Sequence, residues 1–232
     1  MLWQALRGQT LAYDFKGGKA SIRIVDLHRC FNVNSLIGPE AERAQRQLAF
    51  LLGEDMAAER LTQSLTDWLD ADHQSRSQGA ENNEYLRLAP PRLAANQMMV
   101  DTSELNLLLP ADPNREQRHR NLCALPETSG WRLNANALNL DELPLLEAIY
   151  EGKIGRAQLT RLISARPAGG YADASALRQA MGAMDDEAFA QLSEGLQLNS
   201  DHFLLKLEVR LDDQVFRSQY RIEALGVVKW HS

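Results

Sequence analysis

Near its C-terminus the chain reads Phe203-Leu204-Leu205-Lys206-Leu207-Glu208-Val209-Arg210-Leu211. Apolar Leu207, Val209 and Leu211 alternate with charged residues, which is the two-residue period of a strand with one buried face. The turn Asp212-Asp213-Gln214 follows, and a second run with strand character covers residues 215–225. The sequence therefore predicts a β-hairpin at this end of the chain.

A second hairpin is predicted near the N-terminus. Strands are expected over residues 10–15 and 20–26, on either side of the glycine turn Lys16-Gly17-Gly18-Lys19. Ile22 and Ile24 share one face of the second strand, and Arg23 lies on the other face.

Between the hairpins, apolar residues recur at intervals of three and four, which indicates helices. We expect helices over residues 38–52, 56–69, 102–108, 134–150, 155–165, 173–181 and 185–195. Pro39 suits the first helical position, and Gly53 suits a helix end. The predicted fold class is α+β, a small antiparallel sheet formed by both chain ends and interrupted by a large all-α insertion of about 160 residues. No segment obviously covers the apolar face of this sheet.

Composition narrows the functional classes. The chain has 232 residues, 44% apolar composition and a net charge of -6, with a pI near 5.4. No Lys/Arg cluster is present to neutralise phosphates, so nucleic acid is not an expected partner. No run of eighteen apolar residues occurs, and the start of the chain lacks the features of a signal peptide.

Enzymatic function is not expected either, and no catalytic residue is predicted. The sequence contains no H-E-x-x-H, no G-x-S-x-G and no glycine-rich phosphate loop. Its five histidines are scattered without metal-ligand spacing.

The acidic loop, residues 67–85, is the most informative segment for function. Counted from Asp70, the first, third, fifth and twelfth positions carry side-chain oxygens, as ligand positions do in an EF-hand; they are Asp70, Asp72, Gln74 and Glu81. The EF-hand pattern then fails, because Ser75 stands where that loop needs a glycine. The segment is therefore a cation loop of another kind, or a polar loop that only faces water.

The two cysteines, Cys30 and Cys123, match no metal or redox spacing. They are either free or bonded to each other. A bridge between them would require an oxidising compartment.

Four segments of the chain together carry a resemblance to a known family. They are residues 25–36 with Phe31-Asn32-Val33-Asn34-Ser35-Leu36, the acidic loop with Trp68 and Gly79-Ala80-Glu81, residues 95–105 with Asn96 and Glu104-Leu105, and Leu133-Asn134-Ala135-Asn136. In this order they resemble the K subunit of bacterial type II secretion systems, the large minor pseudopilin. The acidic loop is the most specific of the four.

The resemblance implies a pilin-like domain that is split by a helical domain. The pilin-like β part would comprise residues 2–35 and 196–232, and the inserted α-domain residues 36–195. It also implies calcium as the cofactor. The ligands that the resemblance implies are Asp70, Asp72, Glu81 and Asn83. Asp67 would be a hydrogen-bond partner behind them. Asn82 departs from the family, which usually has an acidic residue there, so this site carries one charge fewer.

The resemblance further implies a non-enzymatic role at the tip of the periplasmic pseudopilus. The partners would be the minor pseudopilins I and J, with which the protein would start pilus assembly, and exported proteins could also contact it. Family precursors have an N-terminal hydrophobic helix that anchors them in the inner membrane and covers the sheet. Because Met1-Leu2-Trp3 leads almost directly into the strands, we expect a soluble periplasmic fragment without that helix, and hence without its own contact with the membrane.

Two expectations about this chain follow from the resemblance. The sheet face with Ile22, Ile24, Leu207 and Val209 should be exposed unless a partner covers it. A periplasmic setting also favours a disulfide between the two cysteines.

Two alternatives remain at this point. Residues 133–180 resemble a helix-hairpin-helix DNA-binding unit, in which backbone N–H groups contact a phosphate. Against this, the segment carries as many carboxylates as cations, and the whole chain is acidic. The other alternative is a calcium-dependent interaction module outside secretion.

We interpret Asn32, Asn34, Asn134 and Asn136 as turn and cap residues that fasten the insertion.

Overall fold

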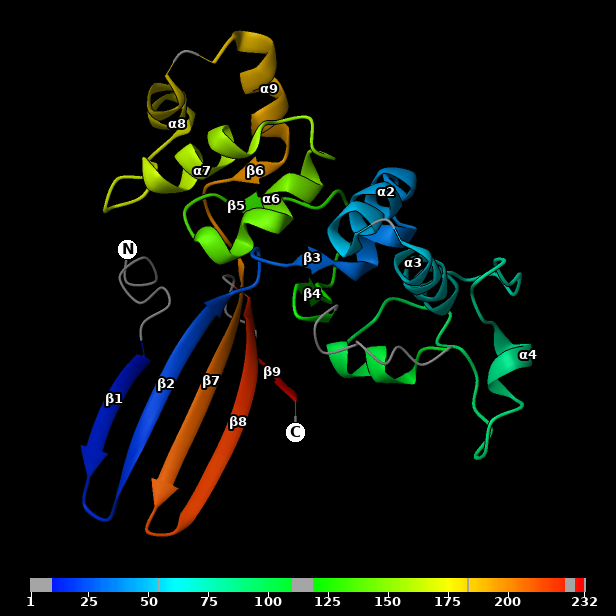
Figure 1. Cartoon of the computed structure of the whole chain (residues 1–232). Helices are drawn as coiled ribbons and strands as arrows, with labels where there is room; N and C mark the ends of the chain where they lie inside the picture. Colours follow the sequence, from blue (N-terminus) through cyan, green and yellow to red (C-terminus); the bar gives the residue numbers. More distant parts are fainter. Residues whose placement is uncertain (1–9, 54, 110–118, 183, 224–227, 232) are drawn as a thin grey trace.

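A computed structural model describes residues 10–53, 55–109, 119–182, 184–223 and 228–231. Strands from both ends of the chain form one antiparallel sheet in the order β1-β2-β7-β8-β9. Their bounds are β1 (Thr10–Phe15), β2 (Gly18–Asp26), β7 (His202–Leu211), β8 (Gln214–Glu223) and β9 (Val228–His231). The helices lie between β2 and β7 in sequence and gather at one end of the sheet (Figure 1). The α+β fold class is confirmed.

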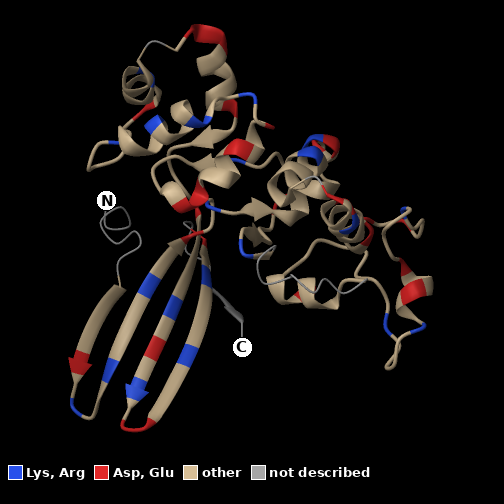
Figure 2. Ribbon diagram, in the orientation of Figure 1, with Lys and Arg blue, Asp and Glu red and all other residues tan. Residues whose placement is uncertain are grey.

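The two faces of the sheet differ in chemistry. Ile22 pairs with Leu207 and Ala20 with Val209, so apolar residues of β2 and β7 share one face. Arg23 pairs with Lys206 on the opposite face, and charged residues recur along these strands (Figure 2). This is the alternation expected of an antiparallel sheet with one face packed and one solvated.

Both predicted hairpins are present, with small differences. Gly18 already belongs to β2, and Gly17 takes a positive φ of 91°, which glycine adopts without strain. Strand β8 ends at Glu223, and residues 224 and 225 lie outside the described part of the chain. Strand β9 was not predicted.

The insertion contains α-helices and short 3₁₀ helices. They are η1 (Val33–Ile37), α2 (Ala41–Leu52), α3 (Met56–Leu69), α4 (Asn82–Tyr85), η2 (Thr102–Leu107), η3 (Leu140–Glu142), α6 (Leu143–Ile149), α7 (Arg156–Ser164), α8 (Ala174–Met181) and α9 (Asp186–Glu194). Figure 1 shows α2–α4 and α6–α9 as two lobes beside each other. A single cluster of buried apolar side chains runs through both lobes.

Two short parallel strand pairs accompany the helices: β3 (Phe31–Asn32) pairs with β4 (Leu122–Cys123), and β5 (Leu133–Asn134) pairs with β6 (Leu196–Gln197). One expected helix is wrong in its start. The helix predicted over 134–150 begins only at Leu143, because asparagine side chains hold the preceding residues in β5 and turns. Helix α2 likewise starts at Ala41, two residues after Pro39.

Part of the apolar sheet face is exposed. Leu11, Tyr13 and Phe216 are 45%, 70% and 51% exposed, and Ile22, Leu207 and Val209 are partly buried. Ile24 was expected in this exposed patch but is buried, because it lies at the end of the face next to the insertion, where it lines a small cavity with Ala137 and Leu138. The predicted domain boundaries at 35/36 and 195/196 stay predictions.

Candidate metal site

Helix α3 brings the acidic loop to its position. The Asp55 carboxylate accepts a hydrogen bond from Ala58 N at the start of the helix. At its end, the Trp68 ring packs edge-on against Tyr85, with the ring centroids 5.2 Å apart. Trp68 Nε1 also donates to Glu104 in η2, at 3.2 Å. Asp70 follows the last helical residue, and its backbone N donates to the carbonyl oxygen of Thr66 at 2.9 Å.

Three carboxylates converge in this loop. Asp70, Asp72 and Glu81 each offer an oxygen, and these atoms all lie within 4.8 Å of one another. Glu81 precedes α4, and its backbone N donates a hydrogen bond to Glu84 Oε2 at 3.0 Å. The structure thus brings together three of the four predicted ligands. Asn83 is exposed on α4, and its role as a ligand stays a prediction.

Glu81 has the least favourable environment of the three. Its residue is 1% exposed, and neither carboxylate oxygen has a hydrogen-bond partner among the described residues. Burial, and then the nearby charges of Asp67 and Asp70, raise the pKa of Glu81 to about 7. Asp70 Oδ1 is also buried without a partner in the described part of the chain. A hard divalent cation bound by these oxygens would supply the missing partner, so the donor set fits calcium.

Arg76 is the cation of the loop itself. Its backbone N donates to Asp67 Oδ2 at 3.0 Å, and its Nη1 donates to Asp67 Oδ1 at 2.5 Å and to Asp70 Oδ2 at 2.7 Å. Asp67 is fully buried, and burial raises the pKa of its carboxyl group against the effect of Arg76. Asp67 therefore binds the loop at Arg76, and its role behind the metal ligands stays a prediction. Sequence reasoning missed Arg76, although it is the one Arg or Lys between Asp70 and Glu81.

Two further residues shape the loop. Gly79 lies so close to Asp67 that a Cβ at this position would be 1.9 Å from Asp67 Oδ2. Asn96 Nδ2 donates to the carbonyl oxygen of Asp72 at 2.9 Å. In the sequence, both residues stand out only through the family resemblance. In the structure, Gly79 leaves room for the Asp67 carboxylate, and Asn96 holds the backbone of Asp72.

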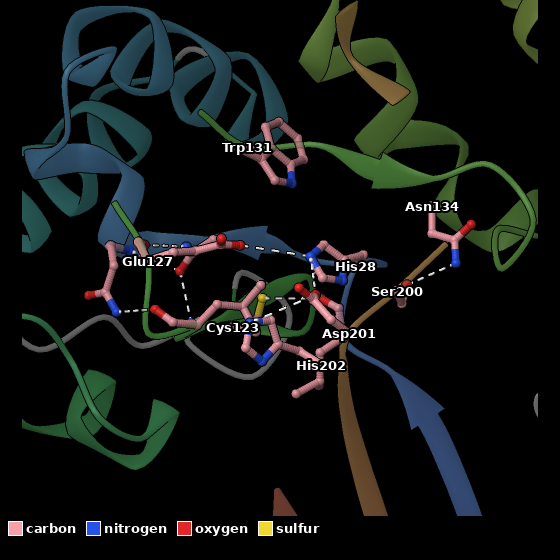
Figure 3. Close-up of polar contacts among 12 residues, drawn as sticks. His28, Cys123, Glu127, Trp131, Asn134, Ser200, Asp201 and His202 are labelled. Atoms are coloured by element: carbon pink, nitrogen blue, oxygen red, sulfur yellow. Dashed lines mark hydrogen bonds and ion pairs between the residues drawn. The ribbon is translucent and has the colours of Figure 1, made fainter. Parts of the chain in front are cut away.

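The cysteines are bonded where the sheet meets the insertion. Cys30 and Cys123 form a disulfide with a Cα–Cα distance of 5.8 Å, beside the β3–β4 pair. Figure 3 shows Cys123 in a polar region that also contains His28, Asp201 and His202. The disulfide expected for an oxidising compartment is therefore present in the structure.

The four asparagines fasten the insertion, as predicted. Asn32 caps η1, and Asn34 bonds to the backbone of Met99 and Leu125. Asn136 bonds to the carbonyl oxygens of Tyr171 and Leu198.

Asn134 connects the insertion to the sheet. Its Nδ2 donates to Asp26 Oδ2 and Ser200 Oγ, at 2.9 and 2.8 Å (Figure 3 draws the bond to Ser200). Asp26 Oδ1 accepts from Ser200 Oγ at 2.6 Å and from His28 N at 2.9 Å. The buried carboxylate at the end of β2 is thus held by donors from three segments.

Residues 133–180, which resemble a helix-hairpin-helix unit, form helices that pack against each other. Helices α6 and α7 pack against each other, and the cations around their turn pair with carboxylates, Arg156 with Glu147 and Lys153 with Glu151. These pairs reduce the positive potential that a DNA phosphate would require.

Together, a sheet built from both chain ends, a helical insertion and an acidic loop with a buried glutamate define the class of large minor pseudopilins. The models of "Type II secretion system (T2SS), protein K" match residues 29–127 and 133–199. The chain belongs to the type II secretion system protein K family.

Relatives and a solved structure agree with this assignment. The protein K of Pectobacterium carotovorum is 30% identical over 93% of this chain and 69% of its own length. That of Aeromonas hydrophila is 30% identical over 94% and 70%, and that of Dickeya chrysanthemi 32% identical over 77% and 49%. The crystal structure of the GspK-GspI-GspJ complex from enterotoxigenic Escherichia coli contains a similar chain, with a TM-score of 0.79, 27% identity and coverage of 97% and 82%.

Within the described residues, no helix is both long and apolar enough to cross a membrane.

Proposed function

We propose that this chain acts without catalysis at the tip of a type II secretion pseudopilus in the periplasm. There it would assemble with the minor pseudopilins I and J, start pilus assembly and support protein export. The observation that carries the proposal is the likeness over 97% of the chain to a protein solved in complex with two such subunits. The family is named for a secretion system rather than for a reaction.

The apolar sheet face supports this proposal. A contiguous apolar patch on a monomer surface marks an interaction site, and here it includes Leu11, Tyr13 and Phe216. An N-terminal helix of the kind that anchors precursors of this family in the inner membrane would cover this face. Exported proteins and the I and J subunits would then meet the remaining surface.

Calcium is proposed as the structural cofactor of the acidic loop. The two unpartnered oxygens of buried Glu81 support this, because an uncompensated buried carboxylate is costly. An ion held by Asp70, Asp72 and Glu81 would fix the loop between α3 and α4. It would thereby keep the insertion in one shape for its partners.

The assembly role is tested by mixing the chain with the soluble domains of the I and J subunits from the same secretion system. Size-exclusion chromatography with light scattering should show a complex that contains all three chains. The I and J mixture alone is the control. If calcium binds but no complex forms at micromolar concentrations, the chain is a calcium-dependent module outside the pseudopilus tip.

The calcium role is tested by calorimetry and thermal melting in calcium and in chelator. Binding should raise the melting temperature of the parent, and the effect should disappear in Asp72→Ala with Glu81→Ala. Asp213→Asn, in the exposed turn between β7 and β8, is the matched control and should behave as the parent. If no calcium binds at millimolar concentrations, the proposed calcium role is wrong and the loop is only a polar turn.

A further inference from the structure

Arg76 places a positive charge inside a site suited to a cation. One guanidinium nitrogen, Nη1, donates to both Asp67 and Asp70. The hydrogen bonds to these carboxylates raise the pKa of Arg76 even though burial lowers it, so the side chain stays charged. Asp70 Oδ2 therefore accepts a hydrogen bond from the guanidinium, while Asp70 Oδ1 is buried without a partner among the described residues.

We propose that Arg76 is an internal counter-cation that holds Asp70 when calcium is absent and yields this carboxylate when calcium binds. The proposal rests on the calcium role proposed above and assigns to that site a residue that limits its affinity. Asp70 is the contested ligand, because it is both a member of the three-carboxylate cluster and a partner of Arg76. Asp67 is not in that cluster, so Arg76 can remain bonded to it in both states.

The charge count explains why a counter-cation is needed. Without Arg76, the four carboxyl groups of Asp67, Asp70, Asp72 and Glu81 would share one partly buried loop with no cation among them. Like charges at such separations repel strongly when water is excluded. One guanidinium supplies a single positive charge, and calcium supplies two. The arginine thus keeps the empty loop folded but is the weaker of the two cations.

The contacts of Arg76 also keep the empty loop close to the shape that an ion requires. Its backbone N and its side chain both bind Asp67, which closes the chain between these residues into a compact turn. Gly79 packs against the same carboxylate. Because the loop is already ordered before calcium binds, no binding free energy is lost in ordering it. Competition for Asp70 is then the principal effect of the arginine on binding.

The experiment is calcium titration by calorimetry on the parent, Arg76→Gln and Arg87→Gln. Arg87 is the matched control, because its side chain is 78% exposed, it lies two residues after α4 and it contacts Glu84 only at 4.0 Å. Arg76→Gln should bind calcium about tenfold more tightly than the parent, since the ion no longer displaces a charge-assisted hydrogen bond. Arg87→Gln should stay within about twofold of the parent, as expected for an exposed charge.

Thermal melting supplies a second readout. In chelator, Arg76→Gln should melt below the parent and Arg87→Gln, because its carboxylates have lost their counter-cation. Calcium should restore it, so the melting shift caused by calcium should be larger than in the parent. Arg76→Lys keeps the charge without the planar fork, and it should be folded in chelator with an affinity closer to that of the parent.

The outcomes separate the two proposals. If the parent binds no calcium, the calcium role itself fails. If the parent binds but Arg76→Gln has the affinity of Arg87→Gln, or a weaker one, Arg76 does not compete with the ion and the inference is overturned.

Discussion

Replacing Asn134 with alanine is expected to weaken the link between the sheet and the insertion. Asn134 is fully buried, and its side chain makes three hydrogen bonds. Two are donated to Asp26 and Ser200, and one is accepted from Asn136 N at 3.0 Å. The variant therefore leaves a buried carboxylate, a hydroxyl group and a backbone N–H with one partner fewer.

The magnitude follows from these three bonds. A hydrogen bond to a charged group contributes about 1.5–3 kcal/mol, and each of the two neutral bonds contributes about 0.5–1.5 kcal/mol. We expect Asn134→Ala to lower the free energy of unfolding by about 2.5–6 kcal/mol. Ser200→Ala should cost less, about 1–2 kcal/mol, because its hydroxyl group is only part-buried. The double variant should lose less than the sum, since both residues serve Asp26.

The assay is urea denaturation at pH 7, followed by circular dichroism and by the fluorescence of buried Trp131, whose Nε1 donates to Cys30 O. Asn199→Ala is the control, since this exposed asparagine lies next to Ser200 in the chain. A loss below about 1 kcal/mol for Asn134→Ala, no larger than that of the control, would refute the reasoning. Water would then replace the asparagine at the junction.

Three further predictions concern the loop and the disulfide. Gly79→Ala should destabilise the protein by more than about 2 kcal/mol in urea melts and should weaken calcium binding, because the new Cβ would collide with the Asp67 carboxylate; wild-type behaviour would contradict the packing described. Replacing Cys30 and Cys123 with alanine removes a loop closure over a sequence separation of 93, which the chain-entropy estimate places at about 4.6 kcal/mol; a loss below about 1 kcal/mol would contradict it. In chelator, the pKa of Glu81, about 7 in the folded state against a usual value of 4.5, favours folding at low pH, so stability should fall by up to about 3 kcal/mol as pH rises from 4.5 through 7. Glu81→Gln should abolish this fall, and a parent protein that is equally stable at pH 5 and pH 8 would show that the carboxylate is not destabilised.

Local patterns were sufficient where neighbours along the chain determine the structure. The period of two at Leu207, Val209 and Leu211 predicted β7, and the period of a helix predicted α3 with both of its ends. The same reasoning failed over 134–150. There the side chains of Asn134 and Asn136 bond to residues more than 30 positions away, which periodicity does not register.

Some features of the candidate site could also be predicted from the sequence, and others could not. The spacing of Asp70, Asp72 and Glu81 made them candidate ligands from sequence alone, because carboxylates so placed in one loop can converge on an ion. Three other features depend on how the loop folds onto the end of α3. Glu81 is buried and its carboxylate has no partner among the described residues, Arg76 bonds to Asp67 and Asp70, and Gly79 has no room for a side chain.

The sequence by itself determined the two terminal hairpins, the helical character of the insertion, the acidic loop and the family resemblance, because these depend on residue type and spacing over a few turns or strands. The tertiary structure decided which strands pair across the insertion, which apolar sheet residues stay exposed and which charges meet in the loop. These properties arise from contacts between distant segments, whose hydrogen-bond partners and burial are set only when the whole chain has packed.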